Sequence, residues 1–375
     1  MTEQPSVTPV RSSGPQALLR AWWQEIMTFA PDTSGPGHAV RVSVAVSAPL
    51  GLLLALGHPE LTSHAVFGAL SSVYGKNHAP GDRLRAQLLA AAALTIAVSL
   101  GALVGVTGPA SAWSVLLMSF LAVAGYLMTR RFGLLPVPSL FLVFAAGTTS
   151  FIPRDWGGAA IAFAVAAVSS LFGVLIGQTG GLFTSSRPKN VTVPQSTSLR
   201  KIFRAPGART QMLQYTLGPL IAGGTATALG LGHPYWAAVS ATVPLAGAAL
   251  AAQLSRATLR LVGTLLGIGL AALMITLLTQ IWMLVVMVAL LQIIIELTVA
   301  RNYGIAVVCI TPSALILSHL AAPTPVNVLV ADRFVETALG VAVATAVLLI
   351  RFPQRRIQPA LSQTEKPGLS SPPIQ

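Results

Sequence analysis

The sequence predicts an all-α integral membrane protein with about twelve transmembrane helices, arranged as two halves of six helices each. The first reason is composition, because the 375-residue chain is 54% hydrophobic and only 9% charged. So few charges cannot cover a soluble globule of this size with a polar surface. The second reason is the content of 33 glycines and 26 prolines, since both residues are commoner in membrane helices than in soluble ones. The third reason is a segment that occurs twice.

The repeated segment is Leu-Ala-Leu-Gly-His-Pro at residues 54–59 and Leu-Gly-Leu-Gly-His-Pro at residues 229–234. At the same separation, which is about half the chain, Arg85 corresponds to Arg260. A match of this kind predicts one membrane unit built twice. With an even number of spans in each half, both copies share one orientation, which makes a parallel repeat about an axis along the membrane normal.

Apolar stretches define the predicted spans. A spanning helix needs about 20 apolar residues, so the second and fifth stretches are short, and Gly or Pro interrupts them. Broken helices are tolerated where the freed backbone groups are satisfied inside the protein or face a cavity. The stretches are residues 39–56, 61–74, 86–106, 113–128, 137–152, 157–178, 215–231, 235–252, 259–278, 281–299, 303–320 and 331–350.

The chain therefore divides into five parts. Residues 37–180 and 211–352 are the two membrane halves, and residues 181–210 form a basic cytoplasmic linker between them. Residues 1–36 comprise a disordered start and an amphipathic helix, and residues 353–375 form a disordered cytoplasmic tail.

The amphipathic helix is predicted between Gln16 and Phe29, where apolar residues recur at spacings of three and four. Its paired Trp22 and Trp23 suit the headgroup zone of a bilayer. Two placements remain open, one at the membrane surface and one packed on the cytoplasmic ends of the other helices.

Charge placement predicts the topology. If both termini are cytoplasmic, all of the 23 Lys and Arg residues except Arg154 and Arg333 lie on the cytoplasmic side. Such an asymmetry follows the positive-inside rule for multi-pass proteins. The formal net charge of +13 does not indicate nucleic acid as a partner, because no basic face with interleaved aromatic residues accompanies it.

Catalytic motifs are absent from the sequence. It has no serine elbow, no His-Glu-x-x-His and a single cysteine, Cys309, so we expect neither an enzyme nor a metal or other cofactor. Gly75-Lys76 resembles the end of a phosphate loop, but Leu70 replaces its leading glycine and Asn77 replaces its hydroxyl residue. Glycine pairs at one-turn spacing predict close helix packing, at residues 101 and 105, 173 and 177, and 263 and 267.

Ionisable residues within apolar spans are functional candidates, because burying them in a membrane is costly. Glu296 lies about one turn from the cytoplasmic end of its span. It is either an acid paired with Arg301 or Arg260, or a carrier of a coupling proton. His64 in the second span either titrates near neutral pH as a second proton carrier or is hydrogen-bonded to a neighbouring helix.

Two further groups of residues have alternative interpretations. Asp332, Arg333 and Glu336 open the last span on the outer side, and they form either an acid-lined mouth or a salt bridge at the helix end. Thr311 and Pro312 fall in the middle of the eleventh span. There a proline produces either a helix break that holds substrate or a simple kink.

The second half resembles the fusaric acid resistance family, also called aromatic acid exporters. The resemblance covers most of residues 215–350. It is weaker in the first half, which retains Arg85 but has Glu60-Leu61 in place of Tyr-Trp, and a linker in place of the sizeable cytosolic domain of the larger exporters. The matching motifs are Tyr235-Trp236-Ala237, Arg256 with Arg260, Gly263-Thr264-Leu265-Leu266-Gly267, Thr311-Pro312, and Asp332-Arg333 followed by Glu336-Thr337 and Gly340.

The resemblance implies an inner-membrane permease that exports small hydrophobic or aromatic organic acids, driven by the proton or charge gradient. In that interpretation Arg260 and Arg85 meet the substrate carboxylate at the inner entrance, where positive side chains attract anions. Alternatives are a passive organic-anion channel and a non-transporting membrane scaffold whose basic linker docks a partner or anionic lipid. The expected partners are the substrate and the lipid bilayer, and a homo-oligomer is compatible with the sequence.

Overall fold

The computed structural model describes residues 15–30, 35–76, 78–108, 112–152, 154–181 and 196–350. Within these ranges the chain folds into helices joined by short loops, with no β-strand, which confirms the predicted all-α class. The disordered tail predicted at residues 353–375, the first 14 residues of the predicted start, and residues 182–195 of the linker lie outside the described part of the chain.

Seven helices of the described ranges are long and apolar enough to cross a membrane, which supports a multi-pass membrane protein. These seven helices do not support the prediction of twelve spans in a six-plus-six repeat. The other segments form helices that are too short, or that carry too many polar side chains, to qualify. The seven are α2 (Pro36–Ala55), α4 (Pro80–Val106), α5 (Ala112–Phe132), α7 (Trp156–Gln178), α11 (Leu250–Leu277), α12 (Ile281–Thr298) and α13 (Tyr303–Ala321).

The remaining predicted spans are also helical. Two of them, α9 (Ala208–Ala228) and α14 (Val326–Leu349), are long enough to span but more polar, and α14 contains Asp332, Arg333 and Glu336. The short ones are α3 (Thr62–Ala69), α6 (Pro138–Ser150) and α10 (Pro234–Thr242). Outside these lie α1 (Pro15–Met27), α8 (Leu199–Arg204) and the single turns η1 (Pro59–Leu61), η2 (Leu70–Val73), η3 (Thr179–Gly181) and η4 (Pro244–Ala246).

Local sequence explains where the helices begin. Proline stands in the first turn of α2, α4, α6 and α10, where its missing N–H would have no helical partner. The side chain of Asp155 caps α7 by accepting a hydrogen bond from the Gly158 amide at 2.7 Å. Asn302 caps α13 by accepting from the amides of Gly304 at 2.9 Å and Ile305 at 3.3 Å.

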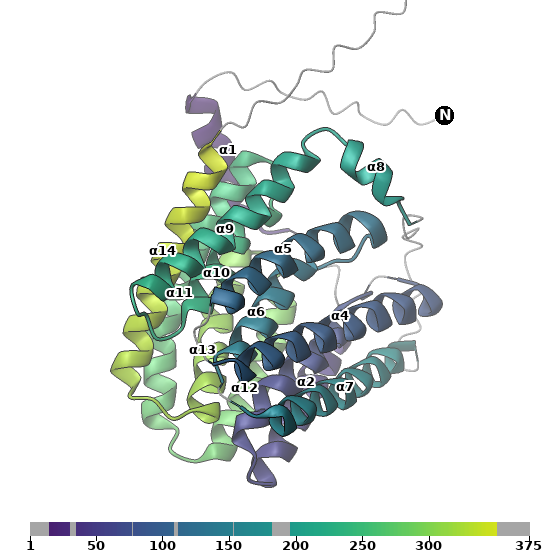
Figure 1. The fold of residues 1–375 in the computed structure, drawn as a ribbon, viewed down its shortest axis with the longest axis vertical. Helices are drawn as coiled ribbons and strands as arrows, with labels where there is room; N and C mark the ends of the chain where they lie inside the picture. Colours follow the sequence, from purple (N-terminus) through teal and green to yellow (C-terminus); the bar gives the residue numbers. More distant parts are fainter. Residues whose placement is uncertain are drawn as a thin grey trace, which may run out of the picture.

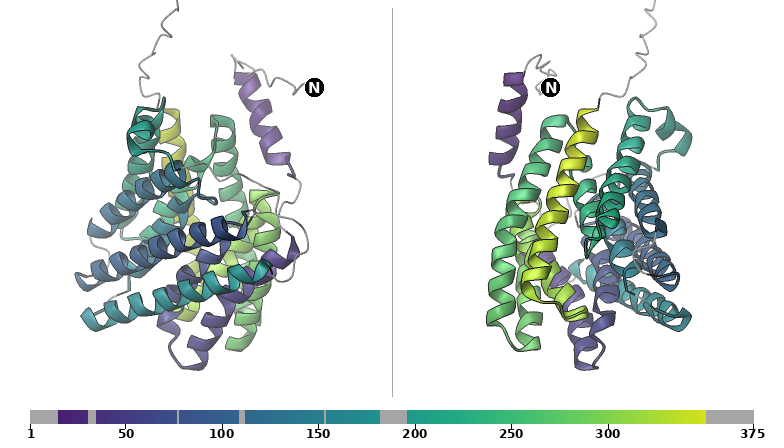
Figure 2. Two further views of the ribbon diagram at one scale, coloured as in Figure 1. Left: turned by 90° about the vertical axis from the view of Figure 1, so that its right-hand side faces the viewer. Right: turned by 60° about the vertical axis from the view of Figure 1, so that its left-hand side comes forward.

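The same pairs of helices pack together in both halves. In the first half α4 contacts α6 and α7, and in the second half α11 contacts α13 and α14. Several helix pairs join the halves, chiefly α2 with α12, α5 with α9 and α6 with α10. Figures 1 and 2 show α4, α5 and α7 running in similar directions and crossing the steeper group of α11, α12 and α14.

The predicted glycine pairs lie at close helix contacts. A Cβ on Gly101 would clash with the backbone oxygen of Ala146 in α6, and one on Gly267 would lie 2.6 Å from Thr311 Cβ of α13. Gly173 likewise faces Ala69, whose backbone oxygen would be 2.7 Å away. Small residues therefore let these backbones approach closely, as predicted.

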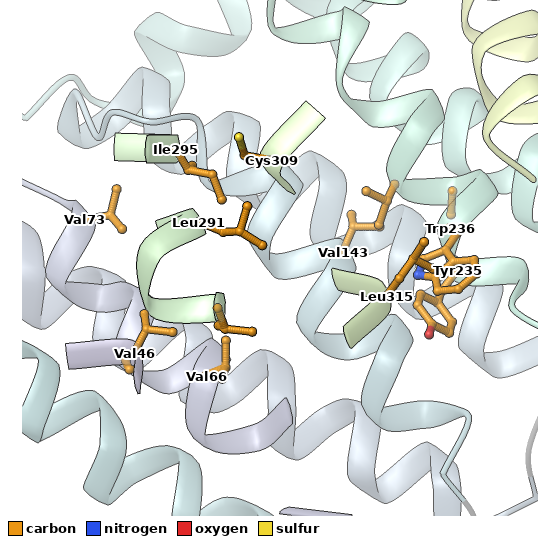
Figure 3. Packing of buried hydrophobic residues seen from close by; sticks show 14 of the residues in the cluster. Val46, Val66, Val73, Val143, Tyr235, Trp236, Leu291, Ile295, Cys309 and Leu315 are labelled. Atoms are coloured by element: carbon orange, nitrogen blue, oxygen red, sulfur yellow. The ribbon is translucent and has the colours of Figure 1, made fainter. Parts of the chain in front are cut away.

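The largest cluster of buried apolar side chains contains residues from both halves, and large apolar side chains also cover the outside. Figure 3 shows Val143 of α6 beside Tyr235, Trp236 and Leu315 of α10 and α13. Helix α1 packs on α11, where Trp22 Nε1 donates to Thr258 Oγ1 at 3.3 Å. This supports the packed placement of α1, and α1, α8 and the last turns of α14 lie at the same end of the molecule (Figure 1).

Candidate functional site

A cavity of about 600 Å³ lies between the two halves. Its wall comes from α2, α3, η2 and α6 of the first half and from α9 to α13 of the second half, together with loops near residues 75 and 136. Pockets of roughly 300–1,000 Å³ are typical of sites for small organic molecules. The cavity is therefore large enough for one such molecule.

The lining of the cavity is mainly apolar and includes aromatic rings from both halves. Phe67 and Tyr215 are buried, and Phe144 packs edge-on against Phe67 with ring centroids 5.0 Å apart. Such surfaces favour an apolar or aromatic solute. The aromatic lining residues are Phe67, Phe141, Phe144, Tyr215 and Tyr303.

The charges on the cavity wall are mainly positive. Lys76, Arg256 and Arg260 line it, and among the described residues Glu296 is its one carboxylate. A low-dielectric cleft with an excess of one sign of charge concentrates solutes of the opposite sign. An amphipathic anion therefore matches the wall better than a cation does.

Arg260 is held at the wall of the cavity by α11. Its side chain is 2% exposed, and Nη2 donates to Ser240 Oγ of α10 at 3.4 Å, a long hydrogen bond. Its Nε makes no hydrogen bond. The guanidinium of Arg256, one turn earlier in α11, lies 5.5 Å from the ring centroid of Tyr303. Arg260 thus keeps donor capacity for a ligand in the cavity.

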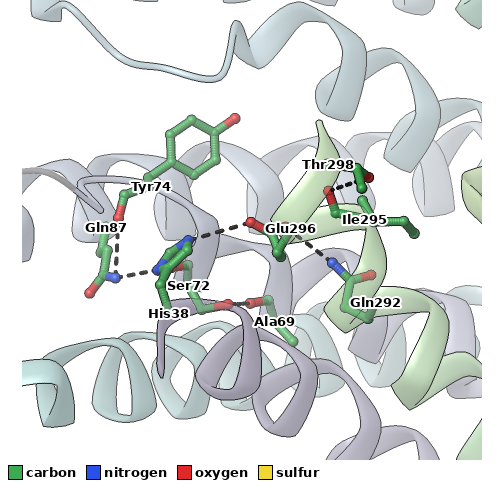
Figure 4. A network of polar contacts seen from close by, with 9 residues as sticks. All are labelled: His38, Ala69, Ser72, Tyr74, Gln87, Gln292, Ile295, Glu296 and Thr298. Carbon is green, nitrogen blue, oxygen red and sulfur yellow. Dashed lines mark hydrogen bonds and ion pairs between the residues drawn. The ribbon is translucent and has the colours of Figure 1, made fainter. Parts of the chain in front are cut away.

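Glu296 makes contact with a residue that sequence reasoning did not single out. One carboxylate oxygen accepts a hydrogen bond from Gln292 Nε2 at 3.2 Å, and the other lies 3.4 Å from His38 Nε2 of α2. Figure 4 shows His38 and Gln292 on either side of the carboxylate. The sequence interpretation named Arg301 or Arg260 as the partner. The only sequence feature that points to His38 is a histidine in the first turn of an apolar helix.

Broken helices border the cavity, but α13, the eleventh predicted span, is not one of them. Helix α13 continues through Pro312 without interruption, so of the two alternatives the structure does not show the helix break. Thr311 faces Gly267 of α11, and neither Thr311 nor Pro312 lines the cavity. A proline within a helix costs one hydrogen bond, and packing against α11 holds this one helical.

The breaks lie instead after α3 and after α10, the second helices of the two halves. After η2, the carbonyls of Ser72 and Tyr74 accept hydrogen bonds from Gln87 Nε2 at 3.3 and 3.2 Å (Figure 4). Gln87 Oε1 in turn accepts from Gln178 Nε2 at 2.6 Å. Backbone groups freed by the break are therefore satisfied inside the protein, as a membrane interior requires.

The three charged residues of α14 do not form a salt bridge among themselves or an open mouth. Arg333 and Glu336 are fully buried. Glu336 Oε1 accepts from the backbone amide of His233 at 2.7 Å, and Asp332 Oδ2 lies 3.2 Å from His233 Nδ1. The two acids thus fasten α14 to the start of α10, and the acid-lined mouth is wrong.

His64 and Arg85 lie away from the cavity wall. His64 is buried in α3, and its Nε2 is 2.8 Å from Nη1 of Arg154. Because a guanidinium can only donate, His64 must accept with that nitrogen, which favours hydrogen bonding over proton carriage. Arg85 is exposed and lines a small separate pocket with His78 and Asp82.

The helices and the cavity together define an all-helical, multi-pass membrane protein with an internal basic cavity of solute size. Residues 221–347 match a family model described as fusaric acid resistance protein-like. The match supports the resemblance that the motifs of the second half predicted, over this part of the chain. No curated protein and no solved structure matches the chain.

Proposed function

We propose that this protein is a secondary active permease that exports small hydrophobic or aromatic organic acids. The observation that carries the proposal is the cavity of about 600 Å³, whose wall combines aromatic rings with Arg256, Arg260 and Lys76. The family match adds transport as the general activity.

The wall offers each part of an aromatic acid a suitable surface. The ring would be buried against Phe144 and Tyr215, which removes apolar surface from water. The carboxylate would accept a charge-assisted hydrogen bond from Arg260, typically worth about 1.5–3 kcal/mol. An uncharged hydrocarbon would leave that guanidinium desolvated and unpaired, so the cavity favours acids over neutral solutes.

Glu296 and His38 are our candidates for proton coupling. They come from opposite halves of the protein, on α12 and α2, and both are buried. Protonation of the carboxylate would remove a charge from the contact between the halves and from the cavity wall. The proton and the substrate anion would therefore both change the charge at the cavity wall, where α12 meets α2.

We further infer that residues 37–180 and 211–352 are two copies of one six-helix unit with the same orientation. The recurring helix pairs and the break after the second helix of each half support this arrangement. We place both termini in the cytoplasm and the protein in the inner membrane, as the distribution of Lys and Arg predicts. A reporter fused after Gln178 should be cytoplasmic, and an external reporter would contradict the arrangement.

The proposed function is tested by growth and by transport. Cells with and without the protein are compared for tolerance of a panel of aromatic, aliphatic and neutral compounds at matched expression. We expect increased tolerance of aromatic acids and none for their neutral amides, because the amides cannot pair with Arg260. Equal tolerance of acids and amides would refute the proposed substrate class.

Purified protein in liposomes separates the alternatives. A secondary active exporter concentrates its substrate against a gradient and stops when a protonophore collapses the driving force. An anion channel only equilibrates the substrate, and a scaffold without transport activity leaves the liposomes as tight as empty ones.

A further inference from the structure

Arg333 is the most unusual charged residue in the interior. Its side chain is 0% exposed, and none of its three guanidinium nitrogens has a hydrogen-bond partner in the described part of the chain. Its Cζ lies 4.8 Å from the centroid of the Trp236 ring, and the Glu336 carboxylate is within electrostatic range without a hydrogen bond to it. A buried charge without hydrogen bonds is costly unless something else pairs with it.

The two acids next to Arg333 in α14, Asp332 and Glu336, contact His233. Glu336, one turn along α14, gives one oxygen to the His233 amide at the start of α10, and its other oxygen makes no hydrogen bond. Asp332 contacts the His233 ring. Glu336 is within electrostatic range of Arg333, but no hydrogen bond joins the two side chains, so the three donors of Arg333 remain unpaired.

Arg333 lies just behind the wall of the cavity. Two residues that line the cavity, Arg260 and Tyr303, are within electrostatic range of its guanidinium. Arg260 Nε and the Tyr303 hydroxyl are also buried without a hydrogen-bond partner. Arg260 and Tyr303 line the cavity and Arg333 does not, but all three side chains carry unused donors and interact electrostatically.

We propose that Arg260, Arg333 and Tyr303 form a binding site for one small monovalent anion at the cavity wall. An anion there would pair with both guanidinium groups and offset the electrostatic repulsion between them. If the proposed export function is correct, the physiological occupant is the carboxylate of the transported acid. Arg333 would then be the second charged group that holds the substrate.

Trp236 provides a direct probe of this site, because it is fully buried and stacked under Arg333. A protein with Trp236 as its sole tryptophan is made by replacing the other five with Phe. Four of those five are more than half exposed, so the replacements should be tolerated. They are Trp22, Trp23, Trp113, Trp156 and Trp282.

Quenching of Trp236 fluorescence is measured in detergent with iodide, an anion, and with caesium, a cation. We expect saturable quenching by iodide and little by caesium, because a cation is repelled by two arginines. Benzoate should displace iodide at lower concentrations than chloride does. Equal quenching by iodide and caesium would overturn the site, and equal displacement by chloride and benzoate would overturn the carboxylate as occupant.

Substitutions test the role of Arg333 in the same protein. R333Q should weaken iodide binding by about tenfold, the change expected from losing one charge-assisted hydrogen bond. R333K should weaken it less, because the charge is retained. R154Q is the matched control, since Arg154 is a partly buried arginine bonded to His64 and outside the cavity lining. Equal effects of R333Q and R154Q would contradict the proposal.

The fluorescence experiment does not depend on transport. If R333Q fails to fold, the comparison of iodide with caesium in the unsubstituted background still decides whether the site exists. An iodide site in a protein that exports no acid would refute the proposed function and leave the site. Export by a protein without the iodide site would refute only the site.

Discussion

Replacing Glu296 by Gln should abolish transport of the substrate against its gradient while leaving transport down the gradient intact. Glu296 is 4% exposed and is the one carboxylate among the described residues that line the cavity. The amide oxygen of glutamine can still accept the hydrogen bond from Gln292, which is 3.2 Å long in the structure. E296Q therefore removes a titratable group with little change of shape.

The magnitude follows from the number of available acids. With one carboxylate, each transport cycle couples one proton to one substrate anion. One pH unit is worth about 1.4 kcal/mol, so at zero membrane potential it can sustain about a tenfold substrate gradient. E296Q should reach no gradient beyond equilibration at any imposed pH difference.

The assay uses liposomes with a clamped membrane potential and labelled benzenesulfonate, which stays ionised. A weak carboxylic acid would distribute across the bilayer by itself when a pH difference is imposed, and the sulfonate avoids this. E60Q is the matched control, because Glu60 is about half exposed and pairs with His58 outside the cavity. A tenfold gradient per pH unit in E296Q would refute the assignment of Glu296 as the coupling group.

Three further predictions test the site and the packing. R260Q should weaken binding of an aromatic acid by at least about tenfold. R85Q, at an exposed position outside the cavity, should change the affinity little. Equal losses of affinity in a direct binding measurement would argue against Arg260. G267L should destabilise the protein by about 1–3 kcal/mol, because a Cβ there would lie 2.6 Å from Thr311 Cβ. G269L should not destabilise it, because no atom lies within 4 Å of a Cβ at that position. Thermal unfolding of both variants checks this. E336A should cost about 1 kcal/mol, because it removes the acceptor of the His233 amide, and an unchanged unfolding temperature would show that this cap contributes nothing.

Local patterns predicted the helices well. Each apolar stretch of the sequence is helical in the structure, and the glycine pairs lie at close contacts, because length, hydropathy and residue size act over a few turns of one helix. The motifs around Arg260 and Gly263 were sufficient to identify the family. The number of spans was less predictable, since α3 and α10 combine short helices with breaks.

Contacts between distant segments were not predictable from the same patterns. His38 and Glu296 meet because α2 packs on α12, and nothing near either residue indicates the other. The sequence left open whether Pro312 breaks α13 or only kinks it, and in the structure the helix continues through Pro312. Arg333 was expected near the surface because it begins a span, yet α10 and α14 enclose it under Trp236.

The sequence by itself determined that this is a helical membrane protein whose second half resembles the fusaric acid resistance protein-like family. Those properties follow from composition and short-range spacing, which require no knowledge of the packing. Only the tertiary structure decided which charged groups face one cavity, because burial and partnership depend on how helices far apart in the chain are placed together. Arg260 and Arg85 follow the two Gly-His-Pro segments at the same distance in the sequence, and packing alone puts Arg260 at the cavity wall and leaves Arg85 exposed.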